Sequence, residues 1–169
     1  IDAANVCVHV YEGSYVEDIN FSGKDILVWG VSGAASTTIN GTGAGSTVTF
    51  NTGETTGAVL DGFTITGGTG TVESSNDGGS PCGYEDTETC TIYTDTYRGG
   101  GVYIDGASPT LSNLVITGNT APDYGYTEVS SLDSLYTYSY GGGIYAGNSS
   151  AEIQSVVIES NSADAGGGL

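Results

Sequence analysis

One stretch of the sequence occurs twice. GGGVYIDGASPTLSNLVITGNTA (99–121) returns without a gap as GGGIYAGNSSAEIQSVVIESNSA (141–163), and GGGL (166–169) begins the same phrase again. Between Gly141 and Gly166, where nothing is inserted, the unit is 25 residues long. A repeat of about 20–50 residues that contains several short strands is typical of a solenoid, in which stacked copies share one core.

The apolar residues of the repeat come in short alternating groups, such as Val102/Ile104 and Leu114/Ile116. Alternation with a period of two indicates strands, and Gly, Asn, Ser and Pro mark the breaks between them. Earlier segments fit the same pattern more loosely, namely VCVHVY (6–11), EDINF (17–21), DILVWG (25–30), STVTF (46–50) and GAVLDGFTITGG (57–68). We therefore expect one all-β domain over residues 1–169, with about five stacked coils.

These motifs resemble a known class of repeat. GGGVY and GGGIY, followed by ITGN (116–119) and IESN (158–161), resemble the repeats of polymorphic outer-membrane proteins and related surface proteins. Residues 1–30 resemble the N-terminal cap and first coils of right-handed parallel β-helix proteins, the pectate-lyase-like superfamily. The resemblance implies a right-handed parallel β-helix (solenoid) with an N-terminal cap segment. It implies little about function, because this fold hosts lyases, hydrolases and adhesins alike.

The glycines and asparagines of the repeat have a structural interpretation. Consecutive glycines let the chain turn a tight corner with positive φ and leave no Cβ to clash with neighbouring coils. Asparagine tolerates the left-handed region, and stacked side-chain amides can form a hydrogen-bonded ladder; a ligand-binding row is the alternative. We assign this scaffold role to Gly99, Gly100, Gly101, Asn119, Gly141, Gly142, Gly143 and Asn161.

Two insertions interrupt the path from one repeat to the next. They are TVESSNDGGSPCGYEDTETCTIYTDTYR (71–98) and PDYGYTEVSSLDSLYTYSY (122–140), and we expect both to be long loops. Because both leave the same corner of the repeat, stacking of the coils should place them side by side. Long loops on a rigid scaffold frequently carry function.

The insertions contain most of the tyrosines. Tyrosine offers a wide, stiff, amphipathic contact area, which favours recognition of proteins or sugars. The alternative is that the rings only cover the sheet beneath the loops. The candidate binding surface consists of Tyr84, Tyr93, Tyr97, Tyr124, Tyr126, Tyr136, Tyr138 and Tyr140.

The first insertion also contains two cysteines and several carboxylates. Cys82 and Cys90 flank GYEDTET, which a disulfide could close into a loop in a secreted setting; Cys7 is left over, either buried or available to another chain. The carboxylates admit either a Ca²⁺ site or a solvated acidic loop, and no known calcium motif is present. The candidate ligands are Asp77, Glu85, Asp86 and Glu88.

The composition excludes some classes of partner. The formal net charge is −18, with 2 Lys and Arg against 20 Asp and Glu. Such a field repels nucleic acid and anionic membranes, and no apolar run is long enough for a membrane span. It suits a protein that works outside cells. Three sequons are candidate glycosylation sites: Asn20 (NFS), Asn40 (NGT) and Asn148 (NSS).

No catalytic constellation is evident in the sequence. Lyases of this fold need Ca²⁺ and a cationic base, and glycosidases need converging carboxylates. Arg98 lies in no visible group with acids, and His9 lies beside Cys7 on one strand face, which is a common outcome of alternation. An acid pair drawn from Asp61, Asp105 and neighbouring coils is the enzymatic alternative.

We therefore expect a non-enzymatic extracellular or cell-surface module, structural or adhesive, with no cofactor or with Ca²⁺. The chain starts at Ile1 and stops at the opening of a repeat, so we expect further chain or a second copy, stacked head to tail into a filament, to cover the last coil. Surface polysaccharide and host protein are the candidate partners. The alternatives are a polysaccharide lyase or glycoside hydrolase, or a carbohydrate-binding adhesin of the same fold.

Overall fold

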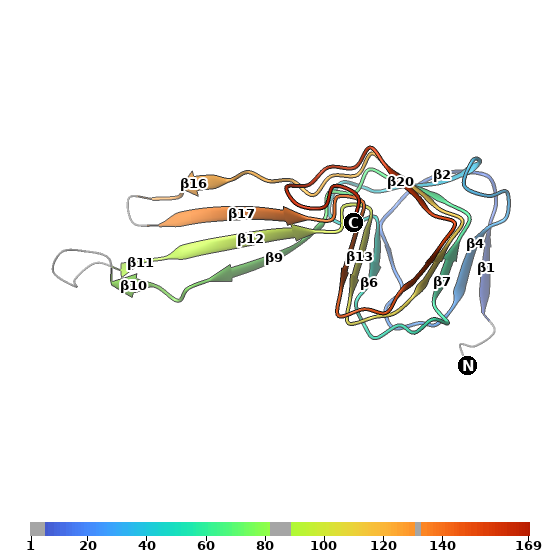
Figure 1. The fold of residues 1–169 in the computed structure, drawn as a ribbon, viewed down its shortest axis with the longest axis horizontal. Helices are drawn as coiled ribbons and strands as arrows, with labels where there is room; N and C mark the ends of the chain where they lie inside the picture. Colours follow the sequence, from blue (N-terminus) through green and yellow to red (C-terminus); the bar gives the residue numbers. More distant parts are fainter. Residues whose placement is uncertain (1–5, 82–88, 131–132) are drawn as a thin grey trace.

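Most strands of the described residues belong to three parallel sheets (Figure 1). The computed structural model describes residues 6–81, 89–130 and 133–169, and the regular structure in this part consists of β-strands. Successive strands enter the first, second and third sheet in turn, so that each passage of the chain adds one strand to each sheet. All pairs within these sheets are parallel.

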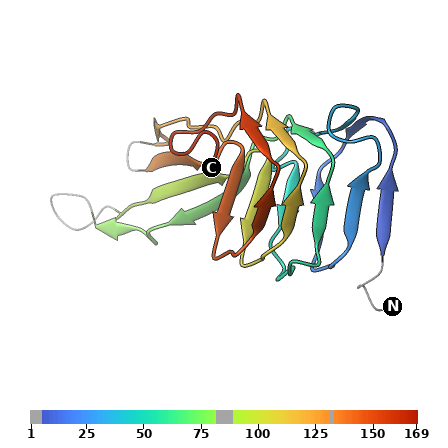
Figure 2. The ribbon, with the colours of Figure 1, turned by 45° about the vertical axis from the view of Figure 1, so that its right-hand side comes forward.

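The first sheet has five strands, in the order β1 (Cys7–Val10), β4 (Leu27–Gly30), β7 (Val59–Asp61), β14 (Thr110–Ser112) and β19 (Glu152–Gln154). The second sheet has the order β2 (Gly13–Val16), β5 (Thr37–Asn40), β8 (Thr64–Thr66), β15 (Val115–Thr117) and β20 (Val157–Glu159). The third has the order β3 (Ile19–Asn20), β6 (Val48–Phe50), β13 (Val102–Asp105) and β18 (Ile144–Gly147). Figure 2 shows the passages side by side from the N-terminus to the C-terminus.

The core consists of rows of inward-facing apolar side chains, and each row runs from strand to strand across a sheet. In the second sheet Ile39 pairs with Ile65, which pairs with Ile116, and all three are buried. Leu60 and Leu111 form a corresponding buried pair in the first sheet. Burial of each such side chain stabilises the fold by about 1.5–3 kcal/mol. The alternation of the sequence thus selects which side of each strand enters the core.

The corner after the second sheet combines glycines with an asparagine ladder. Asn119 is buried, and its Nδ2 donates to Oδ1 of Asn161 (3.0 Å). The positive φ at this corner belongs to Gly118 (67°), and Gly99 opens the next strand with φ 62°. The asparagines therefore stabilise this corner through hydrogen bonds of their side-chain amides, and the residues that adopt the left-handed conformation are glycines.

The two insertions form a fourth sheet that projects sideways from the three others (Figure 1). Its order is β16 (Tyr126–Glu128), β17 (Ser134–Tyr140), β12 (Ile92–Arg98) and β9 (Thr71–Asn76), and the short pair β10 (Ser80–Pro81) and β11 (Thr89–Cys90) lies further out in the first insertion. The strands β12 and β17 pair in parallel, whereas β9 and β16 return antiparallel. The insertions lie side by side as expected, but the expectation of loops is wrong, because IYTDTYR and SLYTYSY alternate and are rich in Tyr and Thr, which favour strands.

Both ends of the stack leave core rows uncovered. Val8 in the first passage and Ile153 and Leu169 in the last are exposed. Residues 7–20 already contribute a strand to each of the three sheets, so the described part of the N-terminal segment is a passage like the others; residues 1–5 lie outside the described residues. Among the described residues, β1 and β19 are the edge strands of the first sheet, and the outer edge of each pairs with no other strand.

Candidate functional site: a tyrosine face on the projecting sheet

Four tyrosines occupy one face of the projecting sheet, which we call the tyrosine face: Tyr126, Tyr136, Tyr138 and Tyr140. Along β17, Tyr136, Tyr138 and Tyr140 are 37%, 45% and 40% exposed, whereas the intervening Thr137 and Ser139 are buried. Tyr126 pairs directly with Tyr136, with ring centroids 5.3 Å apart. The alternation of β17 therefore sends all of its tyrosines to the same side.

The opposite face is packed where the sheet joins the body of the molecule. The backbone N–H of Asp164 donates to Oγ of Ser139 (2.8 Å), and the ring of Tyr97 meets that of Tyr124 at 6.1 Å, edge to face. Burial raises the pKa of Tyr97, with further contributions from the charge of Asp95 and from Tyr124. This face is therefore packed at its inner end, next to the body of the molecule, whereas Tyr93 and Val72 on it are 40% and 48% exposed.

The sequence-predicted tyrosines are thus divided by their role. Four form the tyrosine face. Tyr97 and Tyr124 contact each other on the opposite face, and the register places Tyr93, which is exposed, beside Leu135 on that same face. Tyr84 lies outside the described residues.

A polar cluster lies at the inner end of the tyrosine face, where the projecting sheet meets β13 and β18. Arg98 forms an ion pair with Glu73, and the hydroxyl of Tyr103 donates to Oε1 of Glu73 (2.8 Å). The guanidinium of Arg98 lies 5.3 Å from the ring centroid of Tyr145, which stacks on Tyr103 at 5.7 Å. The expectation that Arg98 lacks an acidic partner is therefore wrong, because antiparallel pairing of β9 with β12 brings Glu73 to it.

Sequence reasoning missed Tyr103, which is buried, and Tyr145, which is half-buried. Both follow the apolar residue of a GGG-apolar-Tyr motif, and the two are in register on β13 and β18. Since Val102 and Ile144 before them point into the core, alternation places the tyrosines outward. The motif itself is the signal that could have found them.

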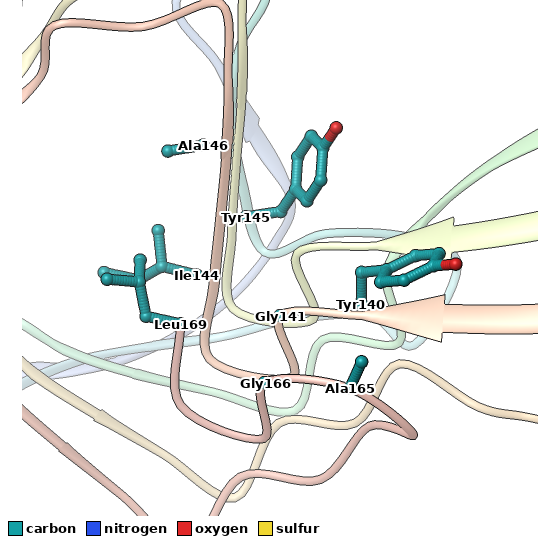
Figure 3. A pocket seen from close by; sticks show the side chains of 8 residues that line it. All are labelled: Tyr140, Gly141, Ile144, Tyr145, Ala146, Ala165, Gly166 and Leu169. Atoms are coloured by element: carbon teal, nitrogen blue, oxygen red, sulfur yellow. The ribbon is translucent and has the colours of Figure 1, made fainter.

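Tyr140 and Tyr145 also border a cavity of about 390 Å³ at the C-terminal end of the stack (Figure 3). The remaining lining is mainly small or apolar and includes Ile144, Ala165 and Leu169. In the close-up both tyrosine hydroxyls point away from Ile144 and Leu169. The cavity therefore joins the end of the core to the inner end of the tyrosine face.

The candidate calcium ligands fall mostly outside the described residues. Glu85, Asp86 and Glu88 are not described, and within the described ranges no three metal-ligating side chains gather. Oδ1 of Asp77 accepts the backbone N–H groups of Gly79 (3.0 Å) and Ile92 (3.1 Å). These bonds hold the pKa of Asp77 below its ordinary value, the bond from Gly79 contributing most. Asp77 therefore closes the turn of the hairpin, and a Ca²⁺ site stays a prediction.

The cysteines are placed only in part. Cys7 is a free, exposed thiol. Cys90 pairs across β10 and β11 with Ser80, which precedes Cys82 by two positions. Cys82 lies outside the described residues, so its disulfide with Cys90 stays a prediction.

The remaining candidate acids and bases are engaged separately. Oδ1 of Asp61 accepts from Nδ2 of Asn113 (2.8 Å) on the first sheet, and Oδ1 of Asp105 accepts from Nδ2 of Asn148 (3.1 Å) on the third. The ring of His9 packs edge to face on Trp29 at 5.3 Å.

Of the three candidate glycosylation sites, Asn20 is exposed, and its Oδ1 accepts the N–H of Ser22 (2.7 Å). The other two sequons are at Asn40, which is half-buried, and Asn148, which is exposed.

A further carboxylate pair lies beside the packed face. Asp123 and Asp164 line a shallow hollow with Ser139, and a hydrogen bond between the two carboxyls is the main cause that raises the pKa of Asp164. Burial and the charge of Asp123 act in the same direction. Two carboxyls that share a proton are closer than the pair of a glycosidase, which must admit a water or a sugar between them.

Comparison with known proteins adds no relative. No family model matches the chain, and no significant match is found among curated proteins or solved structures. Across the described residues no helix is long and apolar enough to cross a membrane. The all-β architecture with parallel sheets is compatible with a β-helix, and function must be argued from the site.

Proposed function

We propose that this chain is a right-handed parallel β-helix, similar to the pectate-lyase-like superfamily and to polymorphic outer-membrane-protein repeats, and that it works as a non-enzymatic adhesive module outside the cell or on its surface. The observation that carries the proposal is the projecting sheet. Two separate insertions pair through β12 and β17 to build one sheet with an exposed, tyrosine-rich face.

Backbone and side-chain contacts connect the projecting sheet to the scaffold. The strands β12 and β17 run directly into the glycines that begin β13 and β18, and the backbone N–H of Gly99 donates to the carbonyl of Tyr140 (3.1 Å). The Arg98–Glu73 ion pair joins two strands of the sheet, and Tyr103 on the third sheet bonds to the same Glu73. A binding surface held in this way loses little conformational freedom when it meets a partner.

A structural role as a stacking subunit is the second candidate. The inward rows of the first sheet end in exposed side chains, Val8 on β1 and Ile153 on β19, beside unpaired strand edges. Such edges accept further strands, either from a continuation of the chain or from a second copy placed head to tail. The adhesive and stacking roles are compatible, because the tyrosine face lies on a sheet separate from these edges.

The adhesive function is tested with protein-coated beads under flow over surfaces that carry polysaccharides, glycoproteins or basic and acidic proteins. We expect retention on at least one surface, competition by free protein, and loss of retention in the double variant Tyr136→Ser/Tyr138→Ser. The matched control is Tyr11→Ser, which removes a tyrosine that is 69% exposed outside the projecting sheet.

Two outcomes contradict the proposal. One is the absence of retention on every surface. The other is turnover, detected as new reducing or unsaturated ends in polysaccharide solutions with and without Ca²⁺, that a single change such as Asp61→Asn or Asp105→Asn abolishes. That result assigns the chain to the carbohydrate-active enzymes instead.

A further inference from the structure

We infer that the tyrosine face binds an uncharged polysaccharide chain, laid along β17 from Tyr136 towards Tyr145. The inference rests on the adhesive function proposed above and names its ligand class. It is carried by three features of the surface: the line of rings, the hydroxyls between them, and the absence of an available cation on this face.

The rings form a continuous line along the sheet. Residues two apart on a strand are separated by about 6.6–6.8 Å, so Tyr136, Tyr138 and Tyr140 present rings at regular steps along β17. Tyr126 extends the line sideways at its outer end, 5.3 Å from Tyr136. Tyr145 marks the inner end of the line, across the cavity that it shares with Tyr140, where Tyr103 and Arg98 already contact its ring (Figure 3). Sugar rings expose flat C–H faces, and exposed aromatic rings on a flat strand are suited to pack against them.

Hydroxyl groups accompany the rings on the same face. The parallel register places Thr94 beside Tyr136 and Thr96 beside Tyr138. Threonine and tyrosine hydroxyls both donate and accept hydrogen bonds, as the hydroxyls of a polysaccharide do. A partner protein would instead need large apolar anchors on this face, and its exposed aliphatic residue is Ile92.

The charge of the molecule selects an uncharged ligand. The formal net charge of −18 repels uronic acid polymers and sulfated chains. Arg98 is the cation on this face, and its guanidinium is already engaged with Glu73 and Tyr145. An anionic sugar would therefore meet no free positive group here, whereas a neutral chain pays no electrostatic cost.

The experiment is affinity electrophoresis of the intact chain in gels that contain xylan, galactomannan or soluble β-glucan, with sedimentation onto cellulose and chitin. We expect retardation by at least one neutral polymer that persists when the ionic strength is raised, and no retardation by polygalacturonate or heparin. In Tyr136→Ser/Tyr138→Ser the association constant should fall by about tenfold or more. Tyr138→Trp, which keeps a flat ring, should retain binding, as should the control Tyr11→Ser. A melting curve for each variant confirms that the fold is intact.

The possible results distinguish a failure of the polysaccharide inference from a failure of the proposed adhesive function. If no neutral polymer binds although beads still adhere through the tyrosines to a protein surface, the ligand class is wrong and the adhesive function stands. Neutral binding that is unchanged in Tyr136→Ser/Tyr138→Ser overturns the tyrosine face as the site. Tyrosine-dependent binding that is confined to acidic polymers, and lost at raised ionic strength, overturns the charge argument.

Discussion

At the scale of single residues, Asn119 illustrates how one side chain secures a corner of the stack. Its Oδ1 accepts the N–H of Gly68 (3.0 Å), and its Nδ2 donates to the carbonyl of Ile65 (3.0 Å) and to Asn161. These partners come from the passages on either side, so the amide joins three passages at a site without access to water.

Asn119→Ala should lower the free energy of unfolding by about 2 kcal/mol or more, because it removes the acceptor of the Gly68 N–H at a buried site and the bonds that the amide donates. Urea denaturation followed by circular dichroism measures the change. The control is Asn51→Ala, at an exposed residue whose amide accepts a bond from the neighbouring Thr52 hydroxyl. Equal stability of the two variants would contradict the ladder.

The pair Asp123 and Asp164 predicts a dependence on pH. The raised pKa of Asp164 means that the folded state binds the proton between the two carboxyls more tightly than the unfolded chain does. The protonated pair therefore stabilises the fold below the ordinary pKa of an aspartate, and this stabilisation is lost as the pH rises through the raised pKa. Asp164→Asn removes the repulsion that remains at neutral pH. We expect a higher melting temperature for the variant at pH 7 and no advantage at strongly acidic pH. An advantage of the same size at every pH would exclude titration as its cause.

At the scale of elements, the glycine corners determine how closely two passages can approach. A Cβ on Gly100 would lie 2.3 Å from the carbonyl oxygen of Gly142 in the next passage, and that oxygen belongs to the backbone. The backbone there cannot move without separating β13 from β18. Gly45 gives the matched comparison, since a Cβ at this position meets no atom within 4 Å and its φ is not positive.

Gly100→Ala should therefore prevent folding or lower the melting temperature strongly, while Gly45→Ala should leave it nearly unchanged. Differential scanning fluorimetry of the two purified variants compares them directly. A Gly100→Ala chain as stable as the parent would show that the corner relaxes, and the close approach of the passages would then not be a requirement of the fold.

The same scale shows what the sequence could predict. Aligning GAVLDGFTITGG (57–68) with TLSNLVITGN (110–119) at an offset of 51 predicts that Leu60 pairs with Leu111 and Ile65 with Ile116, and both pairs are present in the sheets. The strands of the insertions were missed because their alternation joins tyrosine to threonine and contains few apolar residues. Arg98 and Glu73 were not connected, since their contact depends on an antiparallel return between residues 25 apart.

At the scale of the whole molecule, the strong negative charge opposes association between copies of the chain, whereas the exposed core residues at the ends of the stack favour it. Ile153 continues the inward row of Leu111 and is 41% exposed on the edge strand β19. Val157 is 51% exposed but lies on the outward row of Val115. A substitution of Ile153 therefore changes the exposed end of the core, whereas the same substitution of Val157 changes only the outer surface of the stack.

If the end of the core is covered by a second copy, sedimentation velocity should show association that grows with concentration and with ionic strength, since salt screens the net charge of −18. Ile153→Asp should remain monomeric, because a charge at the end of the inward row would be buried on stacking. Val157→Asp adds the same charge on the outward row and should associate like the parent. A parent chain that is monomeric at every concentration and salt level would show that the exposed row recruits no second copy, and association weakened equally by both variants would indicate general repulsion instead of end-to-end stacking.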